Sequence, residues 1–261
     1  MIGVFDSGIG GLTVVRALMQ HLPGYDVLYF GDTARTPYGS KSPATVIKYA
    51  IENTEFLISQ GAQAVVLACN TASSVAPDIL RRRYDLPFFE VITPAAEMAV
   101  RSSRSGRIGI IGTRATVASG VYEKTIKRLR PEYRVYGSAC PLLVPLVEEG
   151  WLKKPETAMI VKKYLRPLKV REIDTLILGC THYPLLADLI QKKIGQRVRL
   201  IDSSSGVVRG LRLLIETDRV FTKRLHREGR YRFFVSDTTN QFEKVAGAIL
   251  KRHIRLETCT I

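Results

Sequence analysis

The chain lacks any long apolar run, and its apolar stretches stay well short of the roughly 20 residues that a membrane-spanning helix needs. It opens MIGVFDSG, without the basic leader and apolar core of a secretory signal. Only four cysteines, at positions 69, 140, 180 and 259, occur in 261 residues, and none form a C-x-x-C pair. This spacing excludes a disulfide framework, so we expect a cytoplasmic protein with free thiols and no membrane partner.

Complete motifs for nucleotide cofactors are also missing. The loop DSGIGG at 6–11 resembles a dinucleotide loop, but G-x-G-x-x-G from Gly8 would need glycine where Thr13 stands. No G-K-[ST] follows for a phosphate loop. We therefore expect no cofactor and predict that the glycines let the backbone approach a small carboxylate, with Ser7 as a donor.

Positive charge is plentiful, with a formal net charge of +15. The basic residues occur in separate segments, at 81–83, 101–107, 162–171 and 223–232, and no recognised nucleic-acid motif accompanies them. This distribution favours solvated helix faces and a field that guides an anionic substrate. Nucleic acid is not the main target we expect, although the basic surface leaves a second interaction open.

Apolar runs alternate with helical patterns through the first half of the chain. We expect strands at 2–5, 26–31 and 64–68, with a helix after the glycine loop and another that starts at Pro43 behind an N-cap at Ser42. Alternation of this kind is typical of βαβ units and a parallel sheet.

The second half repeats this plan from Arg107, where Ile108–Thr113 (IGIIGT) aligns with Ile2–Ser7 (IGVFDS). A strand at 198–201, a helix at 206–216, the strand-like RYRFFVS at 230–236 and a helix at 240–251 follow the repeat. We expect the chain to return to its first domain there, giving domains of 1–97 plus 208–261 and of 98–207. The predicted fold class is α/β: two similar domains with mainly parallel sheets flanked by helices, and an active site in the cleft between them.

Two strand-like runs, AVVLAC and TLILGC, each end in a cysteine followed by small polar residues. Ligands of open parallel sheets bind at the carboxyl ends of the strands, so Cys69 and Cys180 would face one shared cleft. Two thiols on opposite walls suit racemisation, because one removes an α-proton while the other supplies a proton to the opposite face. Donors for the developing charge are expected at Asn70, Thr71, Thr113 and Thr181. Cys140 and Cys259 have no matching partners and are expected to be structural.

Five segments together resemble the glutamate racemases of the cofactor-independent aspartate/glutamate racemase superfamily. They are DSGIGGLTV at 6–14, DTARTPYGSKS at 32–42, ACNTAS at 68–73, CPLLVPLVEEG at 140–150 and GCTHYPLL at 179–186. The resemblance implies two pseudo-symmetric domains and interconversion of L- and D-glutamate without pyridoxal phosphate or metal. It also implies a supply of D-glutamate for peptidoglycan, and we expect a homodimer.

The resemblance also implies roles for individual residues. Cys69 and Cys180 would be the paired acid/base residues, with Asp6 assisting Cys69, and His182 and Glu148 assisting Cys180. The substrate-binding residues it implies are Asp6, Ser7, Tyr38, Gly39, Ser40, Asn70, Thr71, Thr113, Thr116, Thr181 and His182.

Other interpretations stay open from the residues alone. The alternative to a functional role is an N-cap for Asp6, a hydrogen-bonded loop residue for His182 and a solvated helix residue for Glu148. A relative that acts on aspartate, or a one-cysteine decarboxylase or isomerase, is the second enzyme hypothesis. A non-catalytic binding or nucleic-acid interaction protein is the third.

Overall fold

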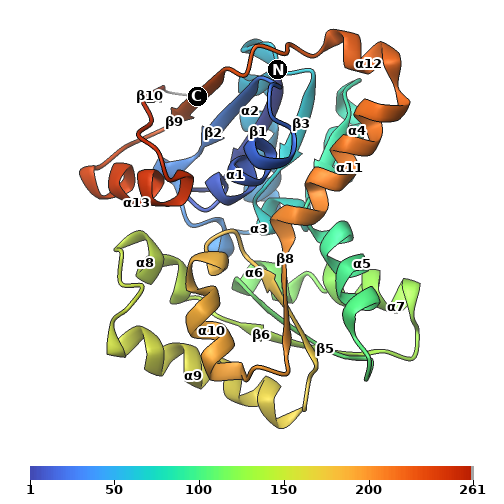
Figure 1. Ribbon diagram of the computed structural model, residues 1–261, viewed down its shortest axis with the longest axis vertical. Helices are drawn as coiled ribbons and strands as arrows, with labels where there is room; N and C mark the ends of the chain where they lie inside the picture. The colour runs from blue at the N-terminus through green and yellow to red at the C-terminus, as the bar shows by residue number, and fades with distance from the viewer. Residues whose placement is uncertain (260–261) are drawn as a thin grey trace.

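The computed structural model describes residues 1–259 and contains two parallel sheets, one above the other in Figure 1. The strand order is β10-β9-β2-β1-β3-β4 in the first sheet and β6-β5-β7-β8 in the second, and all pairings are parallel. The strands are β1 (Ile2–Asp6), β2 (Val27–Gly31), β3 (Ala64–Leu67), β4 (Phe88–Glu90), β5 (Arg107–Gly112), β6 (Arg134–Ala139), β7 (Thr175–Gly179), β8 (Arg199–Asp202), β9 (Tyr231–Val235) and β10 (Leu256–Thr258). The predicted fold class is confirmed.

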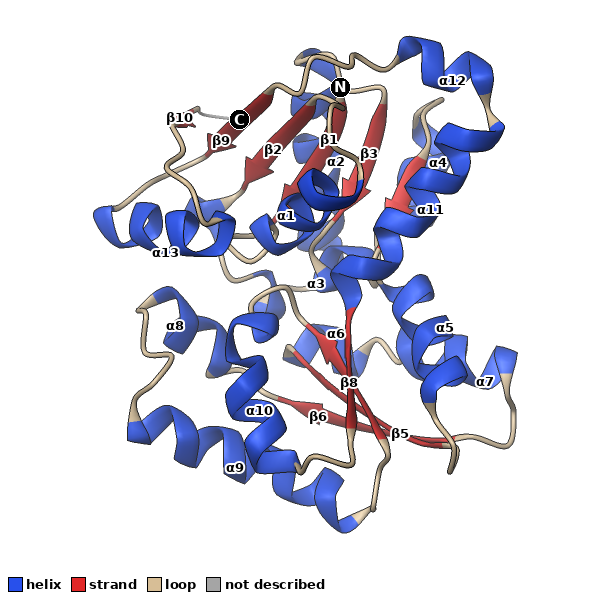
Figure 2. Ribbon diagram, viewed as in Figure 1, coloured by secondary structure: helices blue, strands red, loops and turns tan. Residues whose placement is uncertain are grey.

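Helices cover both faces of each sheet, as Figure 2 shows. On the first sheet, α1, α11 and α13 pack on one face and α2 and α4 on the other. On the second sheet, α8, α9 and α10 face α5 and α7 across the strands. The α-helices are α1 (Leu12–His21), α2 (Pro43–Ser59), α3 (Asn70–Ser73), α4 (Pro77–Arg83), α5 (Ile92–Ser102), α6 (Arg114–Ala118), α7 (Val121–Leu129), α8 (Leu143–Glu148), α9 (Pro155–Val170), α10 (Ala187–Ile194), α11 (Ser203–Thr217), α12 (Arg219–Arg224) and α13 (Asn240–Leu250). We call each sheet with its helices the first and the second domain.

The central strands are buried on both sides, which explains why they read as continuous apolar runs. Every residue of β1, β2, β3 and β7 is buried. Because side chains alternate along a strand, Val4 contributes to one core of the first domain and Phe5 to the other. Within residues 1–259, no helix is both long enough and apolar enough to cross a membrane.

The end of the chain completes the first sheet. Figure 1 shows β9, in red-orange, beside the blue β2, and Phe233 of β9 pairs with Tyr29 of β2. Helix α5 packs on β7 and β8 of the second domain. Helix α11 follows β8 directly in the chain and packs on both α5 and α1. The predicted domain boundaries at 97/98 and 207/208 stay a prediction.

The carboxyl ends of the two sheets meet between the domains. Thr181, which follows β7, donates a hydrogen bond to Asp6 at the end of β1, with 3.2 Å between Oγ1 and Oδ1. Short helices begin at this junction, since Cys69 is the N-cap of α3 and Thr113 the N-cap of α6. The Thr113 hydroxyl accepts from the Thr116 amide, which fixes the start of α6.

Candidate active site

Cys69 forms one side of the junction, where β3 ends and α3 begins. Its side chain is 4% exposed, and its thiol donates to the Ser7 hydroxyl, with 3.5 Å between Sγ and Oγ. Burial raises the pKa of Cys69 to about 12, and the negative charge of Asp6 adds to this rise. The amide of Ala72 and the Ser7 hydroxyl stabilise the thiolate and so oppose this rise in pKa. These surroundings favour the protonated thiol of Cys69.

Asp6 is completely buried beneath the glycine loop. Its Oδ2 accepts the amides of Gly11, at 2.9 Å, and Gly8, at 3.1 Å. Burial raises the pKa of Asp6, although the charge of His182 and these amides act in the opposite direction. The loop also requires glycine at position 10, because a Cβ there would lie 2.4 Å from Oγ1 of Thr181. The loop thus brings Asp6 against the second domain.

Cys180 forms the opposite side, directly after β7, and is 6% exposed. Its Sγ lies 3.7 Å from Nδ1 of His182, and Nε2 of His182 lies 3.1 Å from Oε1 of Glu148. Burial alone would lower the pKa of His182, but its hydrogen bonds to Cys180 and Glu148 outweigh burial and raise that pKa well above its usual value. The protonated form of His182 is therefore favoured beside Cys180.

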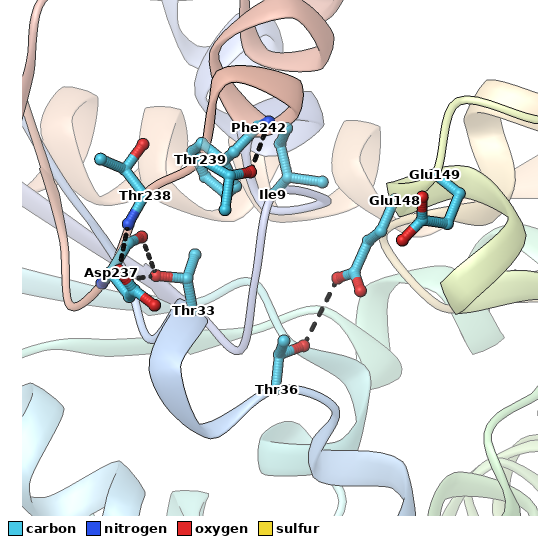
Figure 3. A pocket seen from close by; sticks show the side chains of 9 residues that line it. All are labelled: Ile9, Thr33, Thr36, Glu148, Glu149, Asp237, Thr238, Thr239 and Phe242. Atoms are coloured by element: carbon cyan, nitrogen blue, oxygen red, sulfur yellow. Dashed lines mark hydrogen bonds between the residues drawn. The ribbon is translucent and has the colours of Figure 1, made fainter.

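Glu148 connects this side to the first domain. Thr36 donates to Glu148, with 3.4 Å between Oγ1 and Oε1, as Figure 3 shows. A cavity of about 210 Å³ adjoins this contact. It is lined by Ile9, Thr33, Thr36, Glu148, Glu149, Asp237, Thr238, Thr239 and Phe242.

Three threonine hydroxyls from the two domains form a closed cluster nearby. Thr71 of the first domain lies 2.9 Å from Thr113 and 3.2 Å from Thr116 of the second, measured between Oγ1 atoms. Thr113 and Thr116 lie 3.0 Å apart. All three are buried. Such hydroxyls can exchange their mutual hydrogen bonds for those of a carboxylate.

The PYGS segment lies beside this cluster. Gly39 and Ser40, together with Thr71, line a second cleft of about 630 Å³ between the domains. The Tyr38 hydroxyl instead points into the first domain, where it donates to Asp32 and accepts from Asn53. The structure therefore groups Gly39 and Ser40 with the other candidate residues, whereas the Tyr38 hydroxyl is engaged by Asp32 and Asn53.

Several residues of this region carry no strong sequence signal. Tyr29 donates to the Gly8 carbonyl and Asp32 accepts from Arg35 and Tyr38, so both hold loops of the site. Tyr122 of α7 donates to Asn70. Asp32 and Thr36 do fall within the DTARTPYGSKS segment. Tyr122, in contrast, is a single aromatic residue on a helix face, which periodicity cannot distinguish from a core residue.

The other two cysteines each follow an edge strand, Cys140 after β6 and Cys259 after β10. Cys140 is buried and Cys259 is half-buried, and burial raises the pKa of both thiols, that of Cys140 to about 12. Across residues 1–259, no group of three or more His, Cys, Asp or Glu side chains is arranged to hold a metal ion.

Residues 11–209, well over half of the chain, match the Asp/Glu/Hydantoin racemase family. A curated glutamate racemase of Syntrophus aciditrophicus is 45% identical over 97% of this chain and 93% of its own length. The chain belongs to the Asp/Glu/hydantoin racemase family.

Within that family, the chain stands among the glutamate racemases. A crystal structure of a glutamate racemase isoform from Bacillus anthracis superposes with a TM-score of 0.94 at 35% identity, covering 100% of this chain and 97% of that one. A Francisella tularensis glutamate racemase in complex with D-glutamate gives 0.90 at 38% identity, covering 99% and 97%. A Picrophilus torridus aspartate racemase, at 0.54 and 18% identity, shares the fold alone. The predicted family is confirmed.

Proposed function

We propose that this protein interconverts L- and D-glutamate by a cofactor-independent two-base mechanism in which Cys69 and Cys180 exchange protons with opposite faces of the α-carbon. The observation that carries the proposal is the placement of the two buried thiols. Each follows the carboxyl end of a central strand, one in each domain, at a junction already bridged by Thr181 and Asp6. A substrate held there has one thiol on either side.

The reaction balances with these groups alone. One cysteine, as thiolate, accepts the α-proton, and the electron pair of the broken C–H bond delocalises into the α-carboxylate. The other cysteine, as thiol, donates its proton to the opposite face and becomes a thiolate. The enzyme therefore ends each turnover with the protonation of its two cysteines exchanged, ready for the reverse direction.

The developing charge needs donors that are already in place. Buried hydroxyls of Thr71, Thr113, Thr116 and Thr181 lie at the junction, and we propose that they and the start of α3 at Asn70 bind the two carboxylates. We assign the same role to Ser7, Tyr38, Gly39 and Ser40 in the adjoining loops.

The assisting groups differ between the two cysteines. Asp6 is proposed to assist Cys69 and the substrate ammonium group, because it is a carboxylate at the junction. His182 is proposed to stabilise the Cys180 thiolate as an imidazolium, held in turn by Glu148. Since both thiols are almost fully buried, substrate entry requires the domains to part and then close.

Isotope exchange in D2O tests the proposal. The purified protein, with no added cofactor, should place deuterium on the α-carbon of both L- and D-glutamate and bring either enantiomer to an equal mixture. Absence of exchange from both enantiomers contradicts the proposal. The same measurement on L- and D-aspartate separates the substrates, and a higher kcat/KM for aspartate would overturn the choice of glutamate.

We further propose that the protein works in the cytoplasm as a homodimer and supplies D-glutamate for peptidoglycan. Rescue of a bacterial strain that requires D-glutamate tests the cellular role, and sedimentation tests the oligomeric state. Nucleic acid is not proposed as the main target. Salt-dependent DNA binding with a Kd of about 1 μM or below would contradict this expectation.

A further inference from the structure

Tyr122 contacts the neighbour of each cysteine, although it lies in α7, outside every segment that carries the family resemblance. Its side chain is 2% exposed. Its hydroxyl donates to Oδ1 of Asn70, the residue after Cys69, at 2.6 Å. Its ring lies against Gly179, the residue before Cys180. One side chain of the second domain thus touches both cysteine segments.

The hydroxyl contact fixes the orientation of the Asn70 amide. Because Oδ1 accepts from Tyr122, Nδ2 must point the other way, and it donates to the Ser203 hydroxyl at 3.4 Å. Burial raises the pKa of Tyr122 well above its usual value, which favours the protonated hydroxyl that donates to Asn70. Asn70 is therefore held by two groups from outside its own helix.

The ring contact depends on glycine at position 179. A Cβ there would lie 3.2 Å from Cε2 of Tyr122 and 2.8 Å from the carbonyl oxygen of Ile111. With glycine, the ring packs directly on the last residue of β7. This contact supports the backbone from which Cys180 projects.

We propose that Tyr122 is a positioning residue that couples the two cysteine segments, holding Asn70 through its hydroxyl and the Gly179–Cys180 backbone through its ring. This role rests on the two-base function proposed above. It predicts that the hydroxyl and the ring contribute to different kinetic parameters, because they act on different segments.

Two substitutions separate these contributions. Tyr122→Phe removes only the hydroxyl and should raise KM about five- to tenfold with little change in kcat, as expected for loss of one buried hydrogen bond that orients a binding group. Tyr122→Leu also removes the ring and should lower kcat by about tenfold or more, because the Cys180 backbone loses its support. If Tyr122→Leu does not fold, Tyr122→Phe still tests the hydroxyl.

A double mutant identifies the route of the hydroxyl effect. In an Asn70→Ala background, Tyr122→Phe should add less than about a twofold change in KM, since its partner is already gone. The matched control is Ser103→Ala, which removes a buried hydroxyl that donates to Asp174 at 2.7 Å. Asp174 directly precedes β7, at the amino ends of the strands and opposite the junction. This control should leave kcat and KM unchanged.

Hydrogen exchange gives a readout that does not require activity. Tyr122→Phe should speed amide exchange in residues 68–74, and Tyr122→Leu should also speed it in residues 177–182, while Ser103→Ala affects neither segment. A parent protein that does not racemise glutamate contradicts the proposed function but leaves this readout intact. Unchanged KM and unchanged exchange in Tyr122→Phe would overturn the role of Tyr122.

Discussion

The half of the site around Cys69 and the half around Cys180 each have a cysteine beyond the carboxyl end of a central strand, but the charged groups near the two thiols differ. Cys69 lies near the Asp6 carboxylate, which together with burial raises the pKa of the thiol to about 12. Cys180 lies 3.7 Å from His182, whose pKa is raised well above its usual value. The protonated imidazole of His182 is therefore favoured beside Cys180, whereas burial and the Asp6 carboxylate favour the protonated thiol at Cys69.

The proposed two-base mechanism needs one thiolate and one thiol, and its two cysteines have unequal neighbours, with His182 beside Cys180 and Asp6 near Cys69. A thiolate must also form at Cys69 in turnover, when a substrate ammonium group can offset the charge of Asp6. The two domains thus share a fold plan but have specialised surroundings for the same chemical group.

The largest expected effect comes from removing either thiol. Cys69→Ala and Cys180→Ala should each lower the racemisation rate by about 10⁴-fold, near the upper end for a positioned acid or base. The remaining cysteine can still abstract and return an α-proton on its own face. Each variant should therefore exchange deuterium slowly into one enantiomer, and the two variants should act on opposite enantiomers, as α-proton NMR in D2O would show.

The folded state of each variant is the control for this comparison, and thermal melting within a few degrees of the parent establishes it. Exchange of the same enantiomer by both variants would contradict the opposite placement of the thiols.

Removing the cation of the Cys180 half should have the next largest effect. His182→Asn should lower kcat/KM by about 10²-fold, because the Cys180 thiolate loses its charged partner. The acid limb of the pH profile of kcat/KM should also move to higher pH, since forming that thiolate then requires a lower proton concentration. Glu148→Gln keeps the imidazole and should give a smaller loss. An unmoved acid limb in His182→Asn would show that His182 does not stabilise the thiolate.

The Cys69 half should respond in the opposite direction to loss of its anion. Asp6→Asn keeps an oxygen that can accept the Gly8 and Gly11 amides but removes the negative charge, so the pKa of Cys69 should fall from about 12. Burial remains, so the fall is partial. Alkylation rates measured for each cysteine by mass spectrometry across pH would show it, and Cys140, buried in the second domain, is the internal reference. A pKa that does not fall would mean that burial alone controls this thiol.

Sequence patterns predicted the parts of this molecule that repeat. The apolar runs at β1, β3, β5 and β7 mark central strands because both faces are buried, and the cysteines follow two of them. The short strand β4 and the edge strands β6 and β10 escaped prediction, since half-exposed or three-residue strands carry little apolar signal. Resemblance identified Asp6 and His182 as candidates. The link from Tyr122 to Asn70 joins residues 52 apart and depends on domain packing, which local patterns do not encode.

The smallest expected effect tests whether the Cys180 half is self-contained. Thr36→Val removes the hydroxyl of the first domain that reaches Glu148 at 3.4 Å (Figure 3). This contact is longer than the 3.1 Å between Glu148 and His182. Because a contact of that length is weak, kcat/KM should fall by less than about threefold. The acid limb of the pH profile should stay in place, in contrast to His182→Asn. If Thr36→Val moved that limb as far as His182→Asn does, the first domain would be holding Glu148 in position, and the imidazolium beside Cys180 would depend on domain closure.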